Sequence, residues 1–157
     1  MPDYVRNKLT IKCNSNEIRG KIKNMIFIEN SKKDQIYLMQ KLLPVPKEFK
    51  DSVGYNEFGY NWCLAVWGTK WEAINSRISE SGDTISISYL TATDPNTKWI
   101  KALCRYIEVL SYVDNLQGDN EISVIHSIYR LYEDCGCKME WTPKSGFHYM
   151  EGEILLY

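Results

Sequence analysis

The first part of the chain alternates between apolar and polar positions. Arg6, Lys8, Thr10 and Lys12 stand between the apolar residues Val5, Leu9, Ile11 and Cys13. This period of two predicts a strand with one buried and one solvent-facing side. Asn14 and Glu17 then have the spacing of a helix N-cap and the acid that faces it. Apolar residues at helical spacing follow and predict a first helix that ends near Ile28.

The middle of the chain combines a long aperiodic stretch with a hairpin pattern. Residues 36–43 are a short apolar segment and predict a strand, stopped by Pro44 and Pro46. Residues 47–72 show little periodicity and predict a long loop held in place by aromatic side chains. Residues 73–78 and 84–90 predict two paired strands, with a turn at Ser81-Gly82-Asp83.

A second helix and further strands complete the pattern. Asp94 as N-cap and Pro95 as first helical residue start the helix. Its apolar stripe runs from Trp99 to Leu110, and Tyr106, Val109 and Val113 widen it, which predicts cover on more than one side. Residues 125–132, 138–141 and 147–157 predict two or three strands, with turns at Cys135-Gly136 and at residues 143–146.

This order of elements predicts one α+β domain over residues 1–157. We expect a ferredoxin-like split β-α-β arrangement, in which an antiparallel sheet carries two helices on one face. The aromatic-rich stretch would be a loop insertion, and the last strands a C-terminal extension.

Composition narrows the class of protein. The chain has 157 residues, with 44% hydrophobic and 25% charged residues, which is ordinary for a globular domain, and it is rich in aromatics, with 11 Tyr and 5 Trp. No apolar block of signal-peptide or membrane-helix length is present. The odd cysteine count of five predicts a reducing environment, so we expect a cytoplasmic protein that does not bind membranes.

The formal net charge of -1 hides an asymmetry. Residues 1–50 carry 11 basic and 5 acidic residues, whereas residues 51–157 carry 8 basic and 15 acidic residues. Two interpretations stay open: the halves attract each other within one fold, or the basic part meets an acidic partner or a phosphate backbone.

Candidate catalytic and metal-binding residues are few. His126 lies in a predicted strand and is interpreted as structural, and Glu133 and Asp134 are neighbours that point to opposite faces of a strand. No nucleophile elbow or phosphate-binding loop is found, so the sequence predicts neither an enzyme nor a cofactor. Cys135, Cys137 and His148 form a weak metal candidate, because structural zinc prefers four ligands with Cys-x-x-Cys spacing.

Two surfaces are candidates for binding. Trp62, Trp67, Lys70 and Trp71 surround a Gly-Thr turn, and they form either a recognition surface for a protein partner or a core that pins the loop. The alternative surface consists of Arg6, Lys8 and Lys12, beside Ser86 and Ser88 of the expected neighbouring strand. That surface would bind RNA or DNA through phosphates, but it lacks aromatic residues on which bases stack.

Several short motifs resemble one known family. Asn7-x-Leu9-Thr10-Ile11, Leu43-Pro44-x-Pro46, Asn61-Trp62 and above all Trp67-Gly68-Thr69-Lys70-Trp71 are similar to segments of the YubB-type ferredoxin-like family. Its members are small proteins of phages, plasmids and pathogenicity islands, and their function is unknown. This chain departs from the family pattern at Leu64-Ala65-Val66 and at Thr93-Asp94.

The resemblance implies a ferredoxin-like fold and a protein of a mobile genetic element in the cytoplasm of a bacterial host cell, without catalytic residues to carry over. From it and from the aromatic residues we expect a binding protein that modulates a host or phage protein, for instance by inhibiting a host-defence enzyme. The alternative is an RNA- or DNA-binding module.

Overall fold

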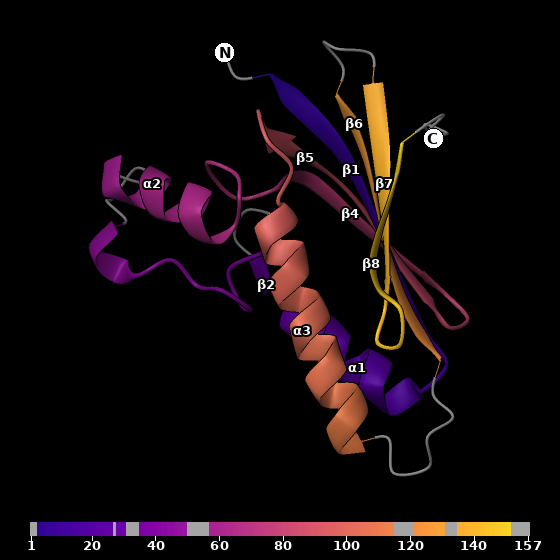
Figure 1. Cartoon of the computed structure of the whole chain (residues 1–157). Helices are drawn as coiled ribbons and strands as arrows, with labels where there is room; N and C mark the ends of the chain where they lie inside the picture. Colours follow the sequence, from indigo (N-terminus) through magenta and orange to yellow (C-terminus); the bar gives the residue numbers. More distant parts are fainter. Residues whose placement is uncertain are drawn as a thin grey trace.

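The main sheet of the protein has six antiparallel strands. The computed structural model describes residues 3–26, 28–30, 35–49, 57–114, 121–130 and 135–151. The strand order is β4-β5-β1-β6-β7-β8, and β2 and β3 form a separate small hairpin (Figure 1). The strands are β1 (Tyr4–Cys13), β2 (Ile28–Asn30), β3 (Gln35–Tyr37), β4 (Ile74–Ser81), β5 (Thr84–Ala92), β6 (Ile122–Arg130), β7 (Cys135–Thr142) and β8 (Gly146–Glu151). The helices are α1 (Asn16–Ile26), η1 (Lys47–Phe49), α2 (Glu57–Val66) and α3 (Thr97–Asp114).

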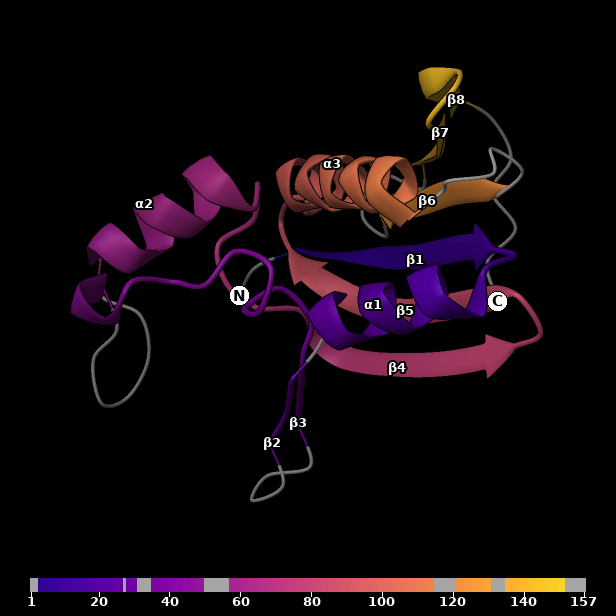
Figure 2. The ribbon, with the colours of Figure 1, turned by 90° about the horizontal axis from the view of Figure 1, so that it is seen from below.

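The α+β class and the antiparallel sheet are therefore confirmed. The full strand order is not that of a ferredoxin-like sheet, because β7 and β8 extend the sheet beyond β6. A third α-helix, α2, lies beside the sheet rather than on it (Figures 1 and 2). The predicted domain thus has the right class, but its sheet is wider than four strands and its helices are more numerous.

Strand β1 lies in the interior of the sheet, because it pairs with β5 along one edge and with β6 along the other. Leu9 lies opposite Ile87 of β5 and opposite His126 of β6. Leu9 and Ile87 are fully buried, as the alternating pattern of β1 predicts. The hairpin of β4 and β5 forms as expected, and Gly82 in its turn has a positive φ of 60°, a conformation that glycine adopts without strain.

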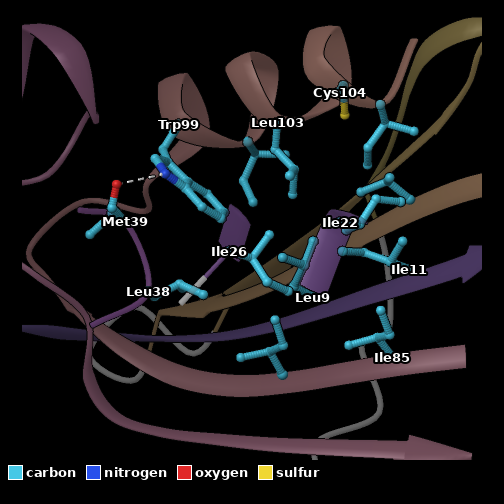
Figure 3. Packing of buried hydrophobic residues seen from close by; sticks show 14 of the residues in the cluster. Leu9, Ile11, Ile22, Ile26, Leu38, Met39, Ile85, Trp99, Leu103 and Cys104 are labelled. Carbon is cyan, nitrogen blue, oxygen red and sulfur yellow. Dashed lines mark hydrogen bonds between the residues drawn. The ribbon is translucent and has the colours of Figure 1, made fainter. Parts of the chain in front are cut away.

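Helices α1 and α3 cover one face of this sheet. Ile18, Ile22 and Ile26 of α1 are buried against the apolar side of β1 and β5. Trp99 of α3 is buried beside them, and its indole Nε1 donates a hydrogen bond to the carbonyl of Met39 at 3.3 Å (Figure 3). The predicted apolar stripe of α3 is buried as far as Ile107, as expected. Val109 is 60% exposed, so its prediction as part of the buried surface was wrong. The side chain of Val113 lies outside the described residues.

Several local predictions need correction. The N-cap of α1 is Ser15, whose hydroxyl accepts a hydrogen bond from the Ile18 amide at 3.3 Å, whereas Asn14 accepts one from Glu121. In the predicted strand at residues 36–43, only residues up to Tyr37 are extended, and the remainder forms turns. The supposed loop at residues 47–72 contains α2, and Gly136 lies within β7 rather than in a turn.

The expected turn before β8 is found at residues 143–145. The acidic pair Glu133 and Asp134 and the last predicted strand residues, 152–157, lie outside the described residues.

The side chain of Glu72 attaches the segment after β3 to the start of β4. Its Oε1 accepts hydrogen bonds from the amides of Leu38 and Met39 at 2.9 Å and of Ala73 at 3.0 Å. Leu38 and Met39 are fully buried, so these amides have no access to water. One carboxylate thereby satisfies backbone donors from two distant segments.

We expect Glu72→Gln to destabilise the protein by about 1–2 kcal/mol, because a neutral amide oxygen accepts hydrogen bonds more weakly than a carboxylate. Glu72→Ala should cost about 3 kcal/mol or more, since it leaves buried amides unpaired. Urea denaturation followed by circular dichroism measures both losses. Glu121→Gln, at an exposed position, is the control, and equal stability of all variants would contradict the role of Glu72.

Candidate functional site

The face of the sheet opposite α1 and α3 is polar, and none of the described helices covers it. Alternate residues of each strand point to this face, because the register pairs Lys8 of β1 with Ser88 of β5 and Ser127 of β6. The hydroxyl-bearing residues of this side are Thr10, Ser79, Ser81, Thr84, Ser86, Ser88, Ser123, Ser127 and Thr142. We call this surface the open face.

Positive charge is concentrated on the open face. Arg77, Lys8 and Lys138 stand in one row across the sheet, since Arg77 pairs with Ser88 and Lys138 pairs with Ser127. Alternate strands are about 10 Å apart, so the row places a cation at that interval. Arg6 and Lys12 flank Lys8 along β1 and are both exposed.

One acid on this face partly offsets the positive charge. Glu140 accompanies Lys138 on β7, with its Oε1 at 3.2 Å from the Lys138 Nζ. Among the described strand residues of the open face, Glu140 is the acidic one, and both residues of the pair are partly exposed. The net charge of the open face is therefore positive, although the whole chain carries -1.

The open face also carries tyrosines that the sequence did not place there. Tyr129 of β6 is paired with Arg6, so both residues belong to the open face, and Tyr4 shares the parity of Arg6 on β1. Both rings are partly exposed. The prediction that this surface lacks aromatic residues was therefore wrong, because the register of β6 against β1 cannot be read from the local pattern of β6.

The tryptophan candidates are divided between core and surface. Trp67 is fully buried and donates a hydrogen bond from Nε1 to the carbonyl of Leu43 at 2.9 Å, so it belongs to the core and does not offer a surface for a partner. Trp62 packs edge-on against it, with a ring distance of 5.6 Å. The interpretation as a core that pins the segment is confirmed for Trp67.

Trp71 and Lys70 remain partly exposed, and the ring of Trp71 lies 6.1 Å from that of Tyr60, which is 39% exposed.

The structure does not assemble the metal candidates. Cys137 pairs with Ile128 and points to the helix side of the sheet, whereas His148 pairs with Glu140 on the open face. The side chain of Cys135 lies outside the described residues. Within the described part of the chain, no group of three His, Cys, Asp or Glu side chains is placed to hold a metal ion.

His126 is a core residue with an unusual hydrogen-bond balance. It is 1% exposed, and its Nε2 lies 2.9 Å from Oδ1 of the buried Asn7. The amide nitrogen of Asn7 donates to the carbonyl of Val5 and to the hydroxyl of Thr91, so Asn7 Oδ1 is the acceptor and His126 Nε2 carries the proton. Burial lowers the pKa of His126 to about 3. The ring is therefore neutral at physiological pH, as expected for a structural histidine.

Comparison with known proteins adds no relative. No protein-family profile matches the chain, and neither the characterised proteins nor the solved structures give a significant match. None of the described helices combines the length and apolar character needed to cross a membrane.

We expect Trp67→Ala to cost about 3–5 kcal/mol of unfolding free energy, because it leaves a large cavity and an unpaired carbonyl at Leu43. Trp71→Ala, at a partly exposed position, should cost about 1 kcal/mol or less. Urea denaturation at pH 7 compares the two. Similar losses for both variants would show that Trp71 also belongs to the core.

The buried neutral His126 makes stability depend on pH. An unfolded histidine binds a proton near its ordinary pKa of 6.5, whereas the folded one does so only near pH 3. Between these values the unfolded state binds more protons, so stability is full above pH 6.5 and falls as pH decreases through this window. From pH 7 to pH 5 we expect a loss of about 2 kcal/mol from this residue. Urea denaturation at both pH values should show this loss in the wild type and not in His126→Gln, and an equal loss in both would exclude His126 as its source.

Proposed function

We propose that this protein binds single-stranded nucleic acid on the open face of its six-stranded sheet. The observation that carries the proposal is the row of Arg77, Lys8 and Lys138, flanked along β1 by Arg6 and Lys12. Cations at regular intervals on a flat surface match a phosphate backbone, which releases counterions when it binds.

The tyrosines support a single strand rather than a duplex. Unpaired bases stack on aromatic rings, and Tyr129 and Tyr4 stand next to Arg6 on the open face. Neighbouring serine and threonine hydroxyls donate and accept hydrogen bonds with sugars and base edges. A flat sheet offers this combination to an extended strand, whereas a duplex groove is usually entered by a helix or a narrow ribbon.

A protein partner is the second candidate function, and one observation favours it. Tyr60 and Trp71 form an aromatic pair at the surface beside Lys70, and aromatic residues are enriched at protein interfaces. With Trp67 in the core, this surface is smaller than the sequence predicted. The hypothesis of a modulator of a host or phage protein, including a host-defence inhibitor, stays a prediction.

We also propose that the inner strands β4-β5-β1-β6, with α1 and α3, form a ferredoxin-like split β-α-β unit to which β7 and β8 are added. The support is that α1 lies between β1 and β4 in the chain, with β2, β3, η1 and α2 inserted after it, that α3 connects β5 to β6, and that β1 stays central. The resemblance to the YubB-type family, and with it the origin in a mobile genetic element, remains a prediction of the motifs.

The nucleic-acid proposal predicts salt-dependent binding. Fluorescence anisotropy with labelled 12-nucleotide single-stranded RNA and DNA should show an affinity that falls steeply with salt. The double variant Arg6→Gln/Lys12→Gln should bind several-fold more weakly, with a salt slope reduced by about 1.4, because two phosphate contacts to a single strand are lost. Both residues are exposed, so the fold should not change.

The double variant Lys41→Gln/Arg105→Gln removes the same charge from exposed positions away from the open face and serves as the control. If the wild type does not bind, or if both double variants lose affinity equally, the open face has no specific role in binding. Tyr129→Leu should reduce affinity further if bases stack on this ring.

A further inference from the structure

A pocket on the helix side of the sheet lies where the helical layer ends. It has a volume of about 540 Å³ and is bounded by the first turns of α3 and by β6, β7 and β8. None of the described helices packs over β7 and β8, as Figure 2 shows for α3, which lies along β6. The volume falls in the range of roughly 300–1,000 Å³ that is typical of small-molecule sites.

Cationic side chains from α3 and β6 line this pocket. Lys98 and Lys101 line it from the first turns of α3, and both are exposed. Lys98 Nζ donates to the carbonyl of Ala65 at 3.2 Å, which leaves its other protons available. Arg130 lines the pocket from β6, and its Nη1 donates to the carbonyl of Thr93 at 3.0 Å.

The N-terminus of the 18-residue helix α3 adds a positive dipole end to the same region, although its Trp99 amide already donates to the carbonyl of Trp67 at 3.2 Å. Asp94 contributes one carboxylate to the lining, so the charge of the lining is positive on balance.

The buried wall of the pocket contains a polar atom without a partner. His126 lines the pocket, and its Nδ1 is shielded from solvent and has no hydrogen-bond partner among the described residues. Since Nε2 carries the proton toward Asn7, Nδ1 is an acceptor. Buried acceptors of this kind are rare because an unpaired one costs free energy. Because Nδ1 is shielded, a molecule inside the pocket meets other atoms of the His126 ring.

The remaining wall is apolar and partly aromatic. Met139 of β7 and Tyr149 of β8 are paired with each other and line the pocket next to Ile128. Tyr149 is 64% exposed, so its ring is available as a flat contact surface. Such a wall favours a planar ring rather than a free inorganic ion.

We propose that this pocket binds a small organic phosphate of the nucleoside monophosphate type. The phosphate lies beside Lys98 and Lys101 in the first turns of α3, and the planar ring lies against Met139 and Tyr149. The pocket opens on the helix side, so it is distinct from the open face and holds a small molecule rather than a strand.

Isothermal titration calorimetry of the full chain with AMP, GMP, CMP and UMP tests this site. At least one monophosphate should bind, and Lys101→Gln should weaken its binding about tenfold, the expected effect of losing one charged hydrogen bond. Arg105→Gln removes a charge one helical turn further along α3, outside the pocket, and should not change the affinity.

The ring nitrogens of His126 provide an independent readout. In a ¹⁵N spectrum of the imidazole, the bound monophosphate should shift the signals of His126, because this ring lines the pocket, whereas inorganic phosphate alone should not. The proposal is overturned if none of the four nucleotides binds, if Lys101→Gln and Arg105→Gln bind equally, or if binding leaves the His126 signals unchanged.

The variant Arg6→Gln/Lys12→Gln separates this proposal from the nucleic-acid function. It should bind the monophosphate as the wild type does, because its substitutions lie on the open face. If it loses the monophosphate, the nucleotide binds on the open face and the pocket proposal fails, while the proposed function stands.

Discussion

Two helices cannot cover a six-stranded sheet, and this geometric constraint shapes the rest of the protein. Neighbouring strands are about 4.8 Å apart, so six strands extend over about 24 Å, whereas two helices packed 8–10 Å apart shield about four strands. Here α1 and α3 cover β4, β5, β1 and β6, and the hairpin of β7 and β8 extends past them. The pocket beside α3 lies at this boundary.

Helices α1 and α3 lie on one face of the sheet, so none of the described helices shields the other face from solvent (Figure 2). The residues on that face are mostly polar, as contact with solvent requires. Residues on the buried side of β1 and β5 are mostly aliphatic, and residues on the open face are mostly serine, threonine, lysine and arginine. A broad polar sheet without a helical cover is an exposed surface that the chain does not need for its core. Binding functions are therefore free to occupy it without conflict with stability.

The residues that stabilise the fold are mostly different from the residues that form the candidate binding sites. Three side chains hold the segments outside the sheet against the core. The indole N–H groups of Trp67 and Trp99 donate hydrogen bonds to the carbonyls of Leu43 and Met39. The carboxylate of Glu72 accepts a hydrogen bond from the amide of Leu38. The charged residues of the open face and of the pocket entrance are exposed or only partly buried. Substitutions at the two kinds of position should therefore separate loss of folding from loss of binding, with His126 as the residue that belongs to both.

The sequence by itself determined the elements whose signal is local. The period of two in β1 and β5, the glycine turn between β4 and β5 and the apolar stripe of α3 depend only on neighbouring residues, and they formed as predicted. Helix α2 was missed because its aromatic residues show no clear polar face, and its burial is decided by contacts with distant segments. Only the tertiary structure decided that Trp67 is core, that Tyr129 stands beside Arg6, and that Nδ1 of His126 lacks a partner. Each of these depends on strand register and on packing between residues far apart in the chain, which no local pattern encodes.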